Sequence, residues 1–234
     1  MTRKALAGRI VLNIPHSCPV FPYGKECWDG DIDVHIDRWT DWYTDWLFTT
    51  DIAGYPAKIT PVVFPFSRFF CDVERLIDDP MESMGQGIVY KRFKDCTRTL
   101  GSYDEKEIVD TYYDSHISRL KSLLTPSSIL IDCHSFPEDL ADVDICIGVN
   151  DDWSRPSEKT IDRSIEIFSS HGYNTGINEP YSNSVSPKMP FEYPSMMLEL
   201  NKRIYMDASG RLDRTKAAMV RNAITELYSF LLTP

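Results

Sequence analysis

Short apolar runs alternate along the chain with longer segments of helical periodicity. The predicted strands are Arg9–Ile14, Ala57–Phe64, Ser128–Cys133, Val143–Ile147 and Ser195–Leu200. The predicted helices are Asp37–Thr49, Asp104–Leu124, Ser157–Ser170 and Leu212–Leu232. This alternation indicates an α/β fold built on a largely parallel sheet. No repeat or Gly/Ser-rich linker interrupts it, so we expect one domain over residues 1–234.

Polar residues of catalytic type follow or end three of the predicted strands. His16 comes just after the first strand, His134 follows the third, and Glu199 lies near the end of the last. In open α/β sheets, ligands bind outside the carboxyl ends of the strands. We therefore expect these three side chains to meet at one edge of the sheet.

Composition narrows the classes of partner. The chain has 234 residues and a formal net charge of −10, which disfavours nucleic acid and anionic membrane as ligands. No run approaches the roughly 20 apolar residues that span a bilayer, and the N-terminus lacks the apolar core of a signal peptide. We expect a cytoplasmic protein whose six cysteines are reduced, and none of them forms a CxxC pair.

Two histidines have a context that suits metal binding. Asp132 and His134 are two residues apart on a predicted strand, so they face the same way, and Asp132 is placed to support the imidazole. His16 follows Ile14-Pro15 at the first strand end. Two histidines and one carboxylate, with an open position for water, form a hydrolytic zinc site. A structural histidine at His16 and a turn-capping Asp132 are the alternatives.

The remaining histidines, His35, His116 and His171, lack such a context, and we expect them at the surface. The third metal ligand is less clearly indicated. Asp41 lies early in the predicted helix after the first strand and is favoured, and Asp45, one turn later, is the alternative. Both acids also fit a simple role at the positive end of a helix dipole.

Two further segments carry charge in unusual places. Arg68 to Arg75 reads RFFCDVER and concentrates guanidinium groups that bind carboxylates, although a surface salt-bridge ladder has the same pattern. Glu199 is an acid within an apolar strand, where burial would raise its pKa and suit it to general acid–base catalysis. Pairing with Lys202 or Arg203 is the alternative for Glu199. No GxSxG, HExxH or P-loop motif is present.

Taken together, eight segments resemble the N-formylglutamate amidohydrolase family. They are PHS, TDWYTD, RFFCDVERLIDDP, GQGIVYKR, DCHSFPEDL, DICIG, NEPYSN and MLELNKRIYMD, in this order from Pro15 to Asp207. The family looks like a distant relative of the zinc carboxypeptidases and of aspartoacylase. The resemblance implies a single α/β domain with a mixed, mostly parallel sheet flanked by helices, and one zinc ion per chain.

The resemblance also implies roles for single residues. Arg68 and Arg75 match the spacing of the two arginines in the aspartoacylase-type pattern, which hold the substrate carbonyl and carboxylate. The asparagine of that pattern is Glu74 here, a departure that leaves Glu74 as a salt-bridge partner or metal ligand. A second departure follows His16, where HxxE is replaced by His16-Ser-Cys-Pro, so the carboxylate ligand must come from elsewhere.

From these roles we expect a zinc-dependent hydrolysis of N-formyl-L-glutamate to formate and glutamate. His16, Asp41 and His134 would bind zinc, Glu199 would act as base and then acid, and Arg68 would stabilise the oxyanion. Arg75 would hold the α-carboxylate, and the side-chain carboxylate would meet Lys91, Arg92, Asn178 or Tyr181. Other N-acyl amino acids or small peptides as substrates, and a non-catalytic amino-acid-binding protein, are the alternative functions. The sequence leaves the oligomeric state open.

Overall fold

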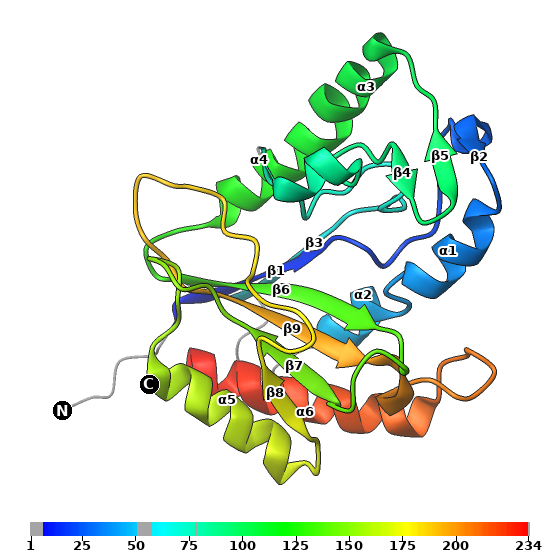
Figure 1. Cartoon of the computed structure of the whole chain (residues 1–234). Coiled ribbons are helices and arrows are strands. Elements are labelled where there is room, and N and C mark those ends of the chain that lie inside the picture. The colour runs from blue at the N-terminus through cyan, green and yellow to red at the C-terminus, as the bar shows by residue number, and fades with distance from the viewer. Residues whose placement is uncertain (1–6, 51–57, 78, 234) are drawn as a thin grey trace.

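The computed structural model describes residues 7–50, 58–77 and 79–233 and has a single-domain α/β fold, which confirms the predicted fold class (Figure 1). Its centre is a six-stranded sheet in the order β3-β1-β6-β9-β7-β8. These strands are β1 (Arg9–Ile14), β3 (Ile59–Val63), β6 (Ser128–Phe136), β7 (Ile145–Gly148), β8 (Thr175–Ile177) and β9 (Ser195–Asn201). The first four in spatial order are parallel, and β7 runs antiparallel to β9, so the sheet is mixed.

Helices cover both faces of this sheet. On one face lie α2 (Thr44–Phe48), α5 (Glu158–Ser170) and α6 (Arg214–Leu232), and on the other lies α4 (Asp114–Leu123), as Figure 1 shows. Strand alternation sends Ile10, Leu12 and Ile14 of β1 into the core under α6, and Val11 into the core under α4. The central strands β1, β6, β7 and β9 are buried on both faces, which explains why they read as nearly continuous apolar runs, whereas the edge strands β3 and β8 are partly exposed.

A second, three-stranded antiparallel sheet lies beside the large one. It consists of β2 (Trp28–Asp29), β4 (Arg92–Phe93) and β5 (Cys96–Arg98). Its own buried cluster contains side chains from α1 (Ile32–Trp39) and from two loops, namely Trp28, Ile32, Ile36, Phe69, Tyr90 and Cys96. The sequence pattern does not indicate this sheet, because strands of two or three residues are too short to show a periodicity.

The single helix predicted over residues 37–49 is wrong. The structure has α1 and α2 instead, and the chain between them turns through Tyr43, whose φ is 67°. The two helices serve different cores, since Ile32 and Ile36 pack in the small-sheet cluster whereas Leu47 and Phe48 pack under the large sheet. A continuous helix could not reach both cores. Asp41 therefore lies in a turn and not in the first turn of a helix.

The third predicted strand is longer than expected. β6 continues to Phe136, so His134 lies within it and pairs with Glu199 of β9. Farther along the chain, the helix predicted over 104–124 is a helical run of α3 (Ser102–Ile108), a π-helical turn (Val109–Tyr113) and α4. Within the described residues, every helix is too short or too polar to cross a bilayer.

Candidate metal centre and substrate cavity

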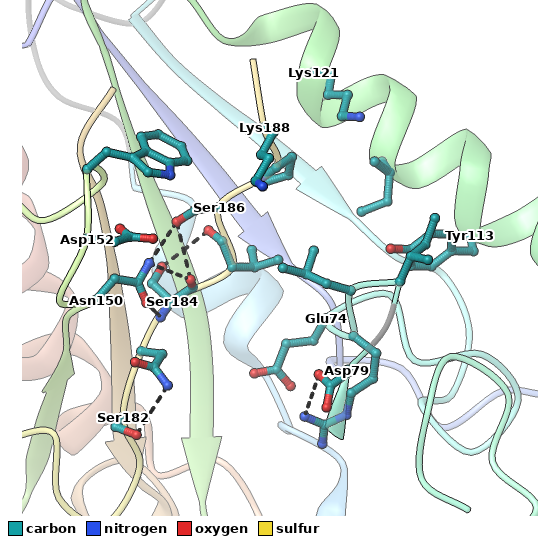
Figure 2. Close-up of a pocket in the computed structure, with 18 of the residues that line it drawn as sticks. Glu74, Asp79, Tyr113, Lys121, Asn150, Asp152, Ser182, Ser184, Ser186 and Lys188 are labelled. Atoms are coloured by element: carbon teal, nitrogen blue, oxygen red, sulfur yellow. Dashed lines mark hydrogen bonds and ion pairs between the residues drawn. The ribbon is translucent and has the colours of Figure 1, made fainter. Parts of the chain in front are cut away.

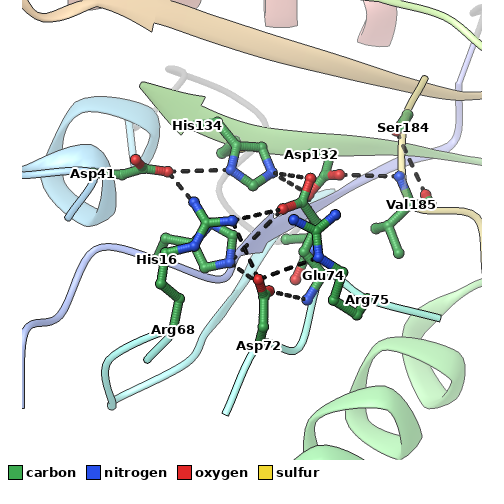
Figure 3. Close-up of polar contacts among 12 residues, drawn as sticks. His16, Asp41, Arg68, Asp72, Glu74, Arg75, Asp132, His134, Ser184 and Val185 are labelled. Atoms are coloured by element: carbon green, nitrogen blue, oxygen red, sulfur yellow. Dashed lines mark hydrogen bonds and ion pairs between the residues drawn. The ribbon is translucent and has the colours of Figure 1, made fainter. Parts of the chain in front are cut away.

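Three side chains from distant parts of the chain meet beyond the end of β1. His16 lies two residues after this strand, His134 projects from β6, and Asp41 comes from the turn between α1 and α2 (Figure 3). The Asp41 backbone N–H donates to the His16 carbonyl oxygen at 2.9 Å, which fastens this turn to the loop after β1. Asp41 Oδ2 lies 3.1 Å from His134 Nδ1 and 3.7 Å from His16 Nδ1.

The donor atoms of this cluster fit a metal ion. The His16, Asp41 and His134 donors all lie within 4.8 Å of one another, and all three residues are buried. His16 Nδ1 is buried and has no hydrogen-bond partner among the described residues, a costly arrangement unless something else occupies that position. Two imidazole nitrogens and one carboxylate form a donor set that zinc accepts, leaving a fourth position open. The residues present therefore fit the group that the resemblance implies.

Each imidazole has a carboxylate on its other side. Asp72 Oδ1 lies 2.8 Å from His16 Nε2, and Asp132 Oδ1 lies 3.0 Å from His134 Nε2. Only the first is an aligned hydrogen bond; the second is an ion-pair contact. Metal-binding histidines commonly hold a carboxylate in this position, which fixes the ring and leaves the opposite nitrogen free for the metal. Asp132 thus lies beside His134 where such a support is expected, and Asp72 occupies the corresponding position beside His16.

The two other candidates for the third ligand occupy different places. Asp45 is exposed on α2 and does not join the cluster. Glu74 lies on the far side of the rings, with its carboxylate oxygens 3.8 Å from His16 Nε2 and 3.7 Å from His134 Nε2. Asp41 faces the Nδ1 atoms, whereas Glu74 faces nitrogens that Asp72 and Asp132 already contact.

Electrostatics concentrate negative charge at this centre. Burial alone would raise the pKa of Asp41, but the hydrogen bond to His134 and the nearby His16 imidazole outweigh it and hold that pKa below its usual range. The pKa of Asp132 is also lowered, because the nearby His134 outweighs burial. The carboxylates are therefore ionised in a largely buried region, where they favour a cation.

Asp72 also connects the centre to two arginines. Its Oδ2 accepts a hydrogen bond from Tyr90 Oη at 2.7 Å and lies 3.2 Å from Arg68 Nη2 and 3.5 Å from Arg75 Nε. Burial would raise the Asp72 pKa, but His16 and the two guanidinium groups hold it well below its usual range. The segment Arg68–Arg75 is thus a largely buried network rather than a surface ladder. The sequence showed Asp72 but gave no reason to select it.

Glu199 is buried on β9, beside His134 in the strand register. Its Oε2 has no hydrogen-bond partner in the described part of the chain, so neither Lys202 nor Arg203 neutralises that oxygen. Burial raises the pKa of Glu199 to about 8, with Asp41 and Glu74 adding to the rise and His134 and Arg68 opposing it. A carboxyl group whose pKa lies near neutrality can both accept and donate a proton.

These groups line a cavity of about 370 Å³, within the roughly 300–1,000 Å³ typical of small-molecule sites. Seven of the residues that were predicted for the site line this cavity, namely Asp41, Arg68, Glu74, Arg75, His134, Tyr181 and Glu199. Other walls come from Tyr90, from apolar side chains such as Trp39 and Phe93, and from Lys94. No periodicity or motif in the sequence indicated Lys94.

Three predicted substrate contacts lie elsewhere. The Asn178 amide accepts from the Val149 N–H at 2.7 Å and donates to the Val149 carbonyl at 3.2 Å, so this side chain holds two loops together. Lys91 lies 3.1 Å from Glu105 on the outer side of the small sheet, and the neighbouring Arg92 is exposed there. None of the three lines the cavity. The structure thus places these three side chains away from the cavity, because proximity along the chain does not give side-chain direction.

A larger cavity of about 700 Å³ adjoins the first (Figure 2). The two share Glu74, Arg75 and Ser182 as a common wall. The second cavity is bounded by α4 and by the loop over residues 182–188, whose Ser184 backbone N–H donates to Asn150 at 3.0 Å. The site thus has room beyond Arg75 for a larger molecule.

Comparisons with known proteins place this arrangement in context. The family model described as N-formylglutamate amidohydrolase matches residues 8–206. A crystal structure of N-formylglutamate amidohydrolase from Ralstonia eutropha JMP134 has a TM-score of 0.77 at 17% identity, over 99% of this chain and 94% of that one. A gene product from Agrobacterium tumefaciens has a TM-score of 0.66 at 15% identity, over 96% and 92% of the two chains. No curated protein matches the sequence.

Proposed function

The chain belongs to the N-formylglutamate amidohydrolase family, and on this premise we propose that it hydrolyses the amide bond of N-formyl-L-glutamate with the help of one zinc ion. The observation that carries the proposal is the convergence of His16, Asp41 and His134 beside the buried acid Glu199. Metal-assisted amide hydrolysis uses ligands for the ion, here two imidazoles and the Asp41 carboxylate, and a separate carboxylate as general base, here Glu199.

His16 Nδ1, His134 Nδ1 and Asp41 would hold the zinc ion, which when bound supplies Lewis-acid polarisation and a lowered pKa for water. Glu199 takes a proton from the attacking water. It then gives this proton to the nitrogen that leaves as the amine, so that one water and one amide become formate and the free amino acid. A single carboxyl group serves both steps because its pKa lies near neutrality.

Arg68 and Arg75 position the substrate. Their guanidinium groups are held by Asp72, so their direction is fixed before the substrate arrives. Arg68, the closer of the two to Glu74, stabilises the charge that develops on the carbonyl oxygen. Arg75 binds the α-carboxylate.

The cavity carries charges of both signs. Three cationic side chains (Arg68, Arg75 and Lys94) and three acidic ones (Asp41, Glu74 and Glu199) line it. A divalent ion would offset the acidic side chains and leave the cations for the two carboxylates of N-formylglutamate. Such complementary charge favours its binding over that of a neutral amide.

The first experiment is a metal determination on the purified protein, paired with formate release from N-formyl-L-glutamate before and after chelation. About one zinc ion per chain and chelator-sensitive formate release are the expected results. Bound zinc without formate release would mean that the enzyme acts on another N-acyl substrate. A protein that binds no metal and shows no turnover, even after zinc is added, would instead be a non-catalytic amino-acid-binding protein.

One observation favours a second candidate substrate class. The adjoining 700 Å³ cavity leaves space for another N-acyl amino acid or a small peptide with a free carboxylate. A panel of N-formyl, N-acetyl and dipeptide substrates separates this candidate from the first by the ratio of their kcat/KM values. The compartment we propose is the cytoplasm, because all six cysteines are free thiols.

A further inference from the structure

We propose that Lys94 determines specificity by binding the side-chain carboxylate of an acidic amino-acid substrate. The inference rests on the proposed function and deepens it, since it names the group that separates acidic substrates from neutral ones. It follows from three independent features of Lys94: its charge, its backbone conformation and the way in which its neighbours are anchored.

The first feature is a positive charge that is not committed elsewhere. Three cationic side chains line the catalytic cavity, and two of them, Arg68 and Arg75, are paired with Asp72. Lys94 is an exposed residue and forms no ion pair with the described residues. After Arg75 has bound the α-carboxylate, Lys94 is the remaining cation for a second carboxylate.

The second feature is an unfavourable backbone. Lys94 and Asp95 form the two-residue loop between β4 and β5, and Lys94 has a φ of 53°. Positive φ in such loops favours glycine or asparagine, which adopt it with less steric strain than lysine. Strained residues of this kind cluster at binding sites, where the surrounding structure holds them in place.

The third feature is that both neighbours of Lys94 are fixed. The Phe93 ring contacts Phe69 at 4.9 Å and Trp39 at 5.9 Å between ring centroids, edge to face. On the other side, Asp95 Oδ1 lies 3.2 Å from His35 Nε2. The backbone that carries Lys94 is therefore positioned before substrate binds, while its ammonium group keeps the flexible stem of a lysine.

The test compares N-formyl-L-glutamate with N-formyl-L-glutamine, which has the same shape but no side-chain charge. Lys94→Asn is the principal variant, because asparagine tolerates positive φ and the hairpin should stay folded. Lys94→Arg restores a cation at the same place. Arg92→Gln is the matched control, since it removes one positive charge from the same hairpin outside the cavity.

The wild type should prefer the glutamate substrate, and Lys94→Asn should reduce this preference about ten- to a hundredfold, mainly through KM for the glutamate substrate. Turnover of the glutamine substrate and the melting temperature should stay at or above their wild-type values. Lys94→Arg should recover part of the preference, and Arg92→Gln should keep all of it.

Two results would overturn the inference alone. In the first, a folded Lys94→Asn variant keeps the wild-type preference for the glutamate substrate over the glutamine substrate. In the second, the wild type hydrolyses both substrates equally well. A wild type that hydrolyses neither substrate would remove the proposed function and this inference with it.

Discussion

The floor of the smaller cavity and its wall are built differently. The floor consists of the cluster of His16, Asp41 and His134 together with Asp132 of β6 and Glu199 of β9. Asp41, His134 and Glu199 line the cavity, whereas His16 and Asp132 are buried and do not line it. The wall consists of the loop with Arg68 and Arg75 and the hairpin that carries Lys94. Long buried strands fix the floor, whereas short strands and loops fix the wall. We infer that the floor determines the reaction and the wall determines which substrate undergoes it.

The strongest test of this division removes a floor residue and its exposed neighbour in parallel. Asp41→Ala should lose the bound metal and lower kcat/KM by roughly a thousandfold or more, since a catalytic ion supplies several kcal/mol of transition-state stabilisation. Asp45→Ala changes an acid four residues away that lies outside the cluster, and this variant should keep the bound metal and the wild-type kcat/KM. Metal stoichiometry and formate release measure the two effects. Equal loss in both variants would contradict the assignment of Asp41.

A second change tests the chemistry of the floor without touching the metal. Glu199→Gln preserves size but cannot accept a proton, so kcat should fall by about 10²–10⁴ while metal content stays at the wild-type level. The decrease of kcat toward low pH that results from protonation of Glu199 should be absent in the variant. Wild-type turnover in Glu199→Gln would rule out its role as base.

The third test concerns Asp72, which connects the floor to the wall. Asp72 contacts His16 as well as both arginines, whereas Asp132 contacts His134, Asn13 and the Val185 N–H. Removing such a support typically costs about 10- to 100-fold in metal affinity or activity. Asp72→Asn should therefore weaken metal binding and raise KM, because Arg68 and Arg75 lose their anchor.

Asp132→Asn is the matched variant on the floor. It should weaken metal binding to a similar degree and leave the KM of the metal-loaded enzyme near that of the wild type. Metal titration and steady-state kinetics at saturating metal separate the two parameters. If both variants change KM equally, floor and wall are not separate parts.

The same division explains how far the sequence predicts the structure. His16, His134 and Glu199 follow or lie in strands with clear apolar patterns, and parallel strands bring their carboxyl ends to one edge, so their convergence was predictable. Asp41 was selected for a helix start that does not exist. It joins the cluster because the chain turns between two helices that pack in different cores.

The wall could not be predicted in the same way. Its strands have two or three residues, and the side that each residue faces depends on the hairpin turn at Lys94 and Asp95. Arg68 and Arg75, which match the motif pattern, line the cavity. Of the residues predicted to meet the second carboxylate, Tyr181 lines it, whereas Lys91, Arg92 and Asn178 do not. Side-chain direction in a short hairpin is a tertiary property.

His116, predicted at the surface, is buried instead and supports the floor from α4. Its Nε2 donates to Asn13 Oδ1 at 2.7 Å, and Asn13 Nδ2 in turn donates to Asp132 Oδ1 at 2.8 Å. Because α4 packs on β1 and β3, this helix face lies against the sheet and not in water. Burial lowers the His116 pKa to about 4.

The smallest predicted effect is on stability and follows from this pKa. In the unfolded chain His116 takes up a proton near pH 6.5, but in the folded protein it does so only near pH 4. Its contribution to the free energy of unfolding is thus present above pH 6.5 and is lost as the pH falls toward 4, by about 3 kcal/mol at most. His116→Gln keeps a donor for Asn13 but cannot titrate, so its stability should fall less steeply over this range. Urea unfolding at several pH values measures the slopes of the wild type and of His116→Gln, and equal slopes for the two proteins would show that His116 does not link stability to pH.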